Sequence, residues 1–245
     1  MKKLIYILIL YISSIVSCTS KPVSINETEI EKNKSYKILS LGDSYTIGES
    51  VCNTCSFPEQ LKDSLKNKFE IETSFTLKII AKTGWNTSDL IDNIDIENPK
   101  NNYALVTLLI GVNNQYQGKP FSLYETEFPE LINTAIAKAG NNKNNVIIIS
   151  IPDYAFTPFG SGDSNITNEI NQYNTFAKNY CESNSLTYVN ITDITRKGLE
   201  NPANLPHNPE VAVSNPVPAN PEKSWRHDVF KAFFMRVPPG GKAIN

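Results

Sequence analysis

The sequence is poor in the residues on which metal sites and basic surfaces depend. It contains two histidines and four cysteines in 245 residues, and both histidines, His207 and His227, lie far from the cysteines of Cys52-x-x-Cys55. Zinc needs two ligands beyond such a pair, so the sequence does not favour a zinc site there. A formal net charge of −2, with no arginine run or basic patch, argues against a nucleic-acid partner. We find no internal repeat and no low-complexity tract.

No apolar stretch is long enough to span a bilayer comfortably, but the first residues resemble an export signal. Met1-Lys2-Lys3 is basic, and residues 4–16 are apolar apart from hydroxyl side chains. The stretch ends in Ile15-Val16-Ser17-Cys18, which resembles the lipobox of bacterial lipoproteins. That resemblance implies that residues 1–17 are removed and that Cys18 carries a lipid anchoring the exported protein to the cell envelope. A plain signal peptide with an incidental cysteine is the alternative.

The chain after the signal is long enough for one domain. Residues 18–34 are polar and without periodicity, which predicts a tether. Removing residues 1–17 takes away two of the 23 basic residues, which leaves 21 against 25 acidic residues. About 210 residues follow the tether, a length that suits a single core. We assign this domain to residues 35–236 and note that residues 200–245 are atypical in composition, with eight of the fifteen prolines.

Cysteine use fits an exported protein. Cys52 and Cys55 stand just before Phe57-Pro58, where a helix is predicted to begin, and not at the helix start that a thioredoxin-like motif needs. A small disulfide that stiffens the loop is the preferred interpretation, and two free thiols are the alternative. Cys181 lies in a helical pattern and is predicted to belong to the core.

Apolar, β-branched runs alternate along the chain with segments of helical spacing, which predicts a parallel sheet covered on both faces. With right-handed crossovers, the expected fold is a three-layer α/β/α sandwich around a flavodoxin-like parallel sheet of about five strands. The predicted strands are Tyr36–Leu41, Phe75–Ala81, Tyr103–Ile110, Val146–Ile151 and Leu186–Ile191. The predicted helices are Phe57–Phe69, Thr87–Ile94, Ser122–Ala139 and Asn168–Asn184.

The loops that follow parallel strands meet at one edge of the sheet, where such folds bind their ligands. The first loop, Gly42-Asp43-Ser44-Tyr45-Thr46, brings a serine hydroxyl to that edge. Taken alone, this motif is also that of an ordinary loop before a helix N-cap. The second loop contains Gly84, whose missing side chain lets a backbone N–H approach a ligand closely. The third contains Asn113, an amide donor that follows a turn glycine, Gly111.

In this order, and each after its own strand, the three motifs resemble those of the SGNH hydrolases, also called GDSL esterases and lipases. The resemblance covers most of the domain and implies that Ser44 is the nucleophile of a serine ester hydrolase. It also implies an oxyanion hole formed by the backbone N–H groups of Ser44 and Gly84 and by the Asn113 side chain, with no cofactor. The family's third motif more often ends in Asn-Asp, whereas this chain has Asn114 in the aspartate's place.

The family's last motif, Asp-x-x-His, is missing where it is expected. Counted back from Trp225, its aspartate and histidine positions hold Ser214 and Val217, neither of which takes up a serine's proton. His207, in a proline loop, and His227, next to charged residues, are the alternatives for the base, although neither has an acid three residues before it. Either the site has diverged or the gene record carries a frameshift, and resequencing the locus distinguishes these hypotheses.

Three functions follow from these residues. The first is a lipid-anchored esterase that acts on acetyl or other short acyl esters of glycans, or on lipid esters. The second is a catalytically impaired surface protein that uses the same cleft to bind a carbohydrate or an acyl group. The third is a phosphate-binding module, which a loop without a glycine-rich cradle or a partner lysine does not favour.

Overall fold

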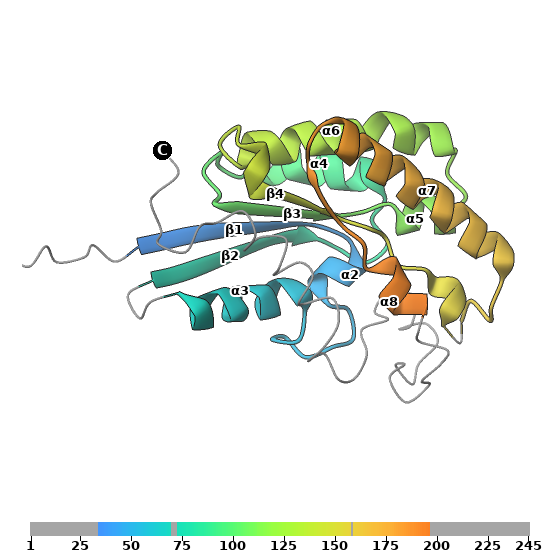
Figure 1. Cartoon of the computed structure of the whole chain (residues 1–245), viewed down its shortest axis with the longest axis horizontal. Helices are drawn as coiled ribbons and strands as arrows, with labels where there is room; N and C mark the ends of the chain where they lie inside the picture. The colour runs from blue at the N-terminus through green and yellow to red at the C-terminus, as the bar shows by residue number, and fades with distance from the viewer. Residues whose placement is uncertain (1–33, 70–72, 158, 197–245) are drawn as a thin grey trace, which may run out of the picture. The chain divides into compact units, whose positions relative to one another are not determined.

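The computed structural model describes residues 34–69, 73–157 and 159–196 (Figure 1). In this part of the chain five strands form one parallel sheet in the order β2-β1-β3-β4-β5. This is the flavodoxin-like order, and the predicted parallel sheet of five strands is confirmed. The strands are β1 (Lys34–Gly42), β2 (Thr73–Ala81), β3 (Leu105–Leu109), β4 (Val146–Ile149) and β5 (Thr187–Val189).

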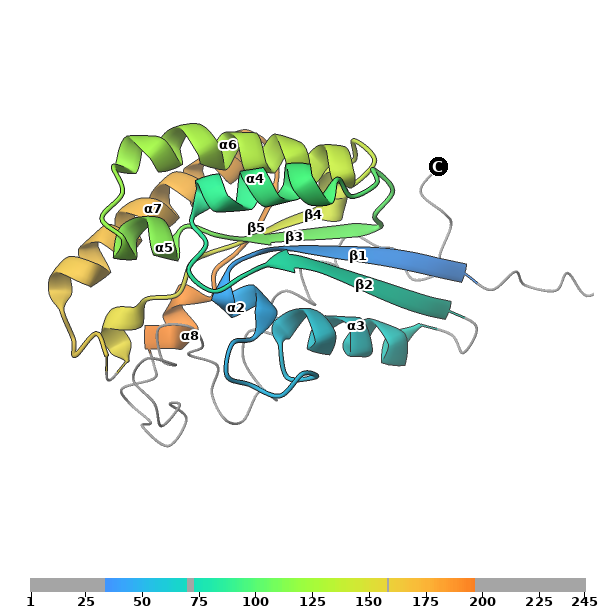
Figure 2. The same cartoon turned by 180° about the vertical axis from the view of Figure 1, so that it is seen from behind.

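Helices cover both faces of the sheet, which confirms the predicted three-layer sandwich. Figures 1 and 2 show α3 on one side of the sheet and α4, α6 and α7 on the other. Short helices α2, α5 and α8 lie where strands end. The long helices are α3 (Phe57–Lys68), α4 (Thr87–Glu97), α6 (Phe121–Lys138) and α7 (Ser164–Ser183), and the short ones are α2 (Ser44–Ile47), α5 (Val112–Tyr116) and α8 (Thr192–Arg196).

The centre of the sheet is buried on both sides. All five residues of β3 and all four of β4 are buried, as near-continuous apolar strands require. One polar pair lies among them: the Thr107 hydroxyl donates to Ser40 Oγ at 2.9 Å and so joins β3 to β1. Between α6 and α7 aromatic rings pack together, with the Tyr124 and Tyr173 centroids 4.6 Å apart.

Local signals account for where the long helices begin and end. Pro58 lies in the first turn of α3, where its missing N–H loses no helical bond. Asn86 caps α4 by accepting hydrogen bonds from Ser88 N and Asp89 N, and the Asp89 carboxylate accepts one from Asn86 N in return. Gly140 follows α6 with φ of +66°, the left-handed conformation that commonly ends helices.

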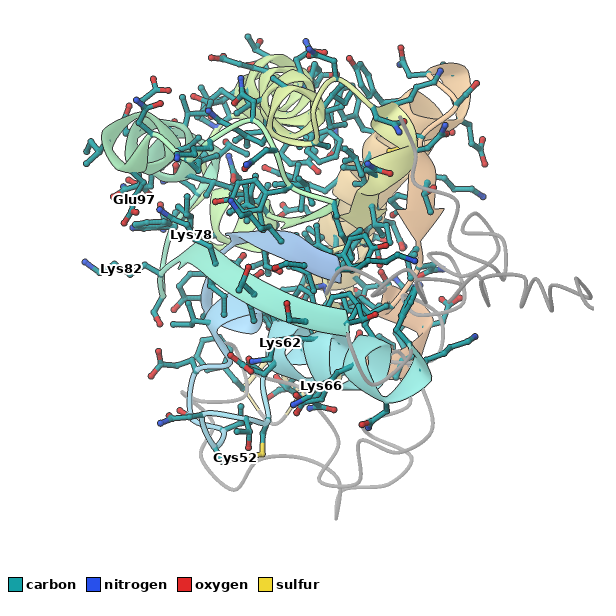
Figure 3. All side chains as sticks on the ribbon, turned by 90° about the vertical axis from the view of Figure 1, so that its left-hand side faces the viewer. Cys52, Lys62, Lys66, Lys78, Lys82 and Glu97 are labelled. Carbon is teal, nitrogen blue, oxygen red and sulfur yellow. A yellow bond between two sulfur atoms is a disulfide. The ribbon has the colours of Figure 1, made fainter. Side chains whose placement is uncertain are left out.

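Strand β2 forms one edge of the sheet, and charged side chains flank it. Figure 3 shows Lys78 on this strand beside Glu97 at the end of α4, and their charged groups lie 2.8 Å apart. Charged residues on an edge strand disfavour pairing with another chain. In the loop between α2 and α3, Cys52 is bonded to Cys55, so the preferred disulfide interpretation agrees with the structure.

The one cysteine predicted to belong to the core is where the sequence places it. Cys181 is fully buried on α7, and burial raises the pKa of its thiol to about 12. Within the described residues, no helix combines the length and apolar character that crossing a membrane requires. Cys18, both histidines, Ser214 and Val217 lie outside the described residues, so the predictions made for them stay predictions.

Candidate active site

The three strands that precede the candidate site residues end level with one another. In the sheet register, Gly42 at the end of β1 pairs with Ala81 at the end of β2 and with Leu109 at the end of β3. Ser44, Gly84 and Asn113 follow these strand ends by two, three and four residues. The topology therefore brings the three loops to one edge, with the serine loop between the other two.

Close packing fixes the turn before the serine. A Cβ atom on Gly42 would lie 2.1 Å from Thr46 Oγ1 and 2.3 Å from the carbonyl oxygen of Leu109, so no other residue fits without a backbone shift. Asp43 then caps α2 by accepting a hydrogen bond from Tyr45 N at 3.0 Å. Ser44 is the first residue of this one-turn helix and is 4% exposed. The sequence suggested a loop and a helix cap here, and the structure has both.

Asp43 is a buried acid directly beside the serine. Burial raises the pKa of its carboxyl group to about 7, against the smaller lowering effect of the hydrogen bond from Tyr45 N. Its second carboxylate oxygen, Oδ2, is buried without a hydrogen-bond partner among the described residues. The Tyr45 hydroxyl is also buried, and burial followed by the charge of Asp43 raises its pKa well above the usual range. The surroundings of Ser44 thus have little access to water.

Gly84 has the backbone conformation and the open space that a close-approach glycine needs. Its φ is +83°, which side chains of L-amino acids rarely adopt. Among the described residues, and apart from Gly84 and its two chain neighbours, no atom lies within 4 Å of the place that a Cβ would occupy, in contrast to Gly42. The backbone at Gly84 is therefore accessible from the side on which a side chain would project.

Asn113 is held against the neighbouring loop. Its Nδ2 donates to the carbonyl oxygen of Trp85 at 2.9 Å, and the residue is 6% exposed. The sequence predicted a turn at this position, whereas the structure has the short helix α5, capped by Gly111. Gly111 has φ of +127°, and a Cβ on it would lie 2.7 Å from the Tyr124 ring. Five residues are too few to show helical periodicity, which explains the difference.

Asn114, the next residue, is fully buried and fastens the third loop to the start of α4. It accepts from Thr87 N at 3.1 Å through Oδ1 and donates to Thr87 Oγ1 at 2.6 Å through Nδ2. The Thr87 hydroxyl in turn donates to Glu127 on α6, which also accepts from Ser88 Oγ at 2.7 Å. This relay connects α4, α5 and α6 directly behind the loops of Gly84 and Asn113.

Gln117 adds a second connection between the same two loops. Its Nε2 donates to the carbonyl oxygen of Gly84 at 2.7 Å, and its Oε1 accepts from Asn86 Nδ2 at 3.1 Å. On the other side, the Thr83 hydroxyl donates to the carboxylate of Glu49, which follows α2. The Gly84 loop is thus bonded both to the loop of Asn113 and to the segment after Ser44.

A partly buried ion pair lies at this edge of the sheet, near the loop after β4. The Asp153 side chain is fully buried, and Arg196 Nε donates to its Oδ2 at 3.0 Å. Asp153 Oδ1 accepts from Ala155 N at 3.1 Å and caps the 3₁₀ helix η2 (Tyr154–Phe156). The pair joins α8, the last helix described, to the loop that precedes η2.

Comparison with known proteins decides the family. A model of the GDSL-like lipase/acylhydrolase family matches residues 40–209, more than half of the chain. The chain belongs to the GDSL-like lipase/acylhydrolase family. The resemblance to SGNH hydrolases that the sequence motifs carry is thereby confirmed, and hydrolysis of esters is the general chemistry of this family. A search of curated proteins gives no match.

Solved structures of esterases share the fold at low sequence identity. The acetyl xylan esterase AlAXEase is 16% identical with a TM-score of 0.58, and the match covers 82% of this chain and all of that one. A catalytic mutant of Axe2, an acetylxylan esterase from Geobacillus stearothermophilus, is 14% identical with a TM-score of 0.56, covering 84% and 95%. A lipase/acylhydrolase from Enterococcus faecalis is 18% identical with a TM-score of 0.52, covering 70% and 84%.

Sequence reasoning placed the three loops at one edge of the sheet but missed the groups that hold them. Ser44, Gly84 and Asn113 all lie at the predicted edge, and Asn113 contacts the Gly84 loop through Trp85. The relay through Thr87 and Glu127 has no local sequence signal, because its members lie 27 and 40 residues apart. Within residues 34–196, apart from the gaps, no cluster of three metal-ligating side chains occurs.

Proposed function

We propose that this family member is a serine hydrolase that cleaves carboxylic esters through an acyl-enzyme on Ser44. The observation that carries the proposal is the level register of Gly42, Ala81 and Leu109. Because of it, a serine at a helix start emerges between a loop with an accessible glycine backbone and a loop with a fixed asparagine amide. A nucleophile flanked by hydrogen-bond donors is the arrangement that acyl transfer requires.

In the proposed reaction, Ser44 Oγ attacks the ester carbonyl carbon while a general base takes the hydroxyl proton. The carbonyl oxygen becomes an oxyanion, which the N–H groups of Ser44 and Gly84 and the Asn113 amide stabilise. An amide nitrogen has two hydrogens, so the bond to Trp85 O orients Asn113 and leaves one hydrogen for the substrate. The alcohol leaves with the proton, and water then hydrolyses the acyl-serine.

We place the general base in residues 197–245, which contain both histidines of the chain, His207 and His227. Histidine is the side chain that most often serves as a general base in catalysis. Replacing each histidine with glutamine in turn tests this assignment. The base variant should lose at least about a thousandfold in kcat, and the other variant should keep wild-type activity. Wild-type turnover in both variants would exclude histidine as the base.

The proposed substrates are acetyl or other short acyl esters of glycans, with lipid esters as the second choice. Two of the compared structures, AlAXEase and Axe2, are acetylxylan esterases, and this supports the first choice by analogy of fold. We also propose that the protein is exported and held at the bacterial cell envelope by a lipid on Cys18. In that case Cys18→Ala should move the protein from the membrane fraction to the soluble fraction.

The catalytic proposal is tested with an aryl acetate and a fluorophosphonate probe on the full-length chain in detergent. Ser44→Ala should abolish probe labelling and reduce turnover at least about a thousandfold. Ser56→Ala is the matched control, because Ser56 is also buried and caps α3 without a side-chain hydrogen bond. Folded wild-type protein with neither labelling nor turnover would contradict the proposal, and labelling without turnover would indicate a nucleophile that lacks its base.

A further inference from the structure

Exposed aromatic rings gather beside the candidate active site. Among the described residues, three large hydrophobic side chains are exposed: Ile96 at 79%, Tyr116 at 50% and Phe159 at 39%. Tyr116 and Phe159 have ring centroids 5.9 Å apart, and both contact the buried Tyr154, at 6.0 Å and 6.2 Å. We call Tyr116, Tyr154 and Phe159 the aromatic cluster. Exposed apolar groups gathered in one place mark binding sites more often than single exposed residues do.

The cluster lies at the same edge of the sheet as Ser44. Tyr116 is the last residue of α5 and stands three positions after Asn113, while Tyr154 and Phe159 come from the loop after β4. A molecule that reaches from Ser44 along this edge would therefore meet the two exposed rings.

The loop that carries Phe159 is firmly bonded to Tyr154. The Thr157 hydroxyl donates to the carbonyl oxygen of Tyr154 at 2.6 Å and accepts from Gly160 N at 3.2 Å. Gly160 packs so closely that a Cβ on it would lie 2.2 Å from that same carbonyl oxygen. A ring held by a bonded loop costs less conformational entropy when a ligand binds than a ring on a loose loop.

Polar groups border the rings. Gln115, the neighbour of Tyr116, donates through Nε2 to Glu169 Oε2 on α7 at 2.6 Å, and this pair is exposed. An apolar surface with an amide and a carboxylate at its rim suits a ligand that is apolar on one face and carries hydroxyl groups at its edge.

A sugar ring has this character. The C–H groups on one face of a pyranose carry partial positive charge and pack on the negative face of an aromatic ring, while its hydroxyls bond to amides and carboxylates. A hydrocarbon chain would make no use of the polar groups at the rim and is better matched by an aliphatic groove. We propose that the aromatic cluster is a subsite for a pyranose ring of a glycan whose ester lies at Ser44. This inference rests on the proposed esterase function and assigns its substrate class.

The test compares one substrate that has a sugar with one that has none. Tyr116→Ala, Phe159→Ala and the double variant are assayed on acetylated xylo-oligosaccharides and on an aryl acetate. Each single variant should lower kcat/KM on the oligosaccharides about tenfold, mainly through KM, while aryl acetate turnover stays within about twofold. Phe159→Tyr should keep the activity, because it retains the ring. Ile96→Ala is the control, since Ile96 is exposed at the far end of α4.

Binding decides the question independently of turnover. Calorimetric titration of the Ser44→Ala protein with unacetylated xylo-oligosaccharide should show binding that the added double substitution abolishes. If binding is absent, or unchanged by the double substitution, the subsite is wrong even where aryl acetate is cleaved. If kcat/KM falls equally on both substrates, or if the variants unfold at lower temperature, the rings support the fold instead, and the proposal fails. Sugar binding without any ester cleavage would refute the esterase function and leave the subsite standing.

Discussion

Asn114 and Thr87 are hydrogen-bonded in both directions: Thr87 N donates to Asn114 Oδ1, and Asn114 Nδ2 donates to Thr87 Oγ1. The Thr87 hydroxyl has a single hydrogen, which it gives to the Glu127 carboxylate. Its oxygen must therefore accept a hydrogen from residue 114. An asparagine supplies that hydrogen and an ionised aspartate does not, which gives a physical reason for this chain's departure from the more frequent Asn-Asp ending of the third motif.

Asn114→Asp should therefore lower both the free energy of unfolding and the rate of ester cleavage. Two carboxylates would then face one hydroxyl, and one of them would lack a hydrogen-bond donor. At a fully buried position this should lower the free energy of unfolding by about 1–3 kcal/mol. Losing this bond should also displace α5 and so lower kcat on an aryl acetate, because Asn113 lies on the same helix. Urea unfolding and steady-state kinetics measure the two effects.

The double variant Asn114→Asp/Glu127→Gln tests whether the direction of these hydrogen bonds matters. The glutamine introduced on α6 can donate to Thr87 Oγ1, and Thr87 can then donate to the aspartate introduced on α5. The direction of the relay is thus reversed, and every group is again satisfied. A double-mutant cycle should give a favourable coupling of about 1 kcal/mol or more and should recover part of kcat. Additive losses would show that the direction of the relay does not matter.

Gly84→Ala should harm catalysis more than stability. An alanine at φ of +83° costs about 1–2 kcal/mol in backbone strain, and its Cβ would project into space that is open in the described part of the chain. If substrate approaches the Gly84 amide from that side, kcat/KM on an aryl acetate should fall about a hundredfold.

Gly140→Ala is the control for that strain. Gly140 has φ of +66°, and an added Cβ would make only an ordinary contact at 3.7 Å. It follows α6, at the end of the sheet where the strands begin, away from the candidate active site. The two variants should lose similar stability in thermal unfolding, and Gly140→Ala should keep its kcat/KM. Equal activity in both would remove Gly84 from the oxyanion hole.

The buried carboxyl of Asp43 should make stability fall as pH rises. Its pKa is about 7 in the folded protein and near 3.8 in the unfolded chain, so between these values the folded state holds the extra proton. Stability is highest below about pH 4 for this group and decreases through pH 7, by at most about 4 kcal/mol. Asp43→Asn keeps an acceptor for Tyr45 N and should remove this dependence. If the free energy of unfolding changed with pH in the same way in both proteins between pH 4 and 8, the assignment would be wrong.

Arg196→Met should be among the more destabilising surface substitutions. It leaves the fully buried Asp153 carboxylate without its partly exposed ion-pair partner, which costs about 1–3 kcal/mol. Adding Asp153→Asn should restore much of the loss, since no charge then remains unpaired. Lys178→Met, which breaks an exposed pair with Glu182, should change the free energy of unfolding by less than about 0.5 kcal/mol. Chemical denaturation of the four proteins measures these differences.

The long elements were predictable because their patterns repeat over many residues. All five strands and the four long helices lie within a few residues of their predicted ranges, and α3 and α4 begin at the predicted residues, Phe57 and Thr87. The one-turn helices α2, α5 and α8 were not predicted, since four or five residues are too short for a period. The bonds that hold Asn113 and Thr87 come from residues distant in sequence, and only the tertiary structure brings them together.

The order of the strands in the sheet differs from their order of synthesis. Strand β1 is made first and lies between β2 and β3, and it is joined to β3 by the bond between Ser40 and Thr107, which are 67 residues apart. The unit of β1, α3 and β2 can form early, whereas closing β3 onto β1 carries the entropy of a long loop. On a growing chain, Ser44 is thus exposed before the Asn113 loop exists to flank it. The proposed oxyanion-hole donors would therefore surround Ser44 only once β3 has paired with β1 and the fold is complete.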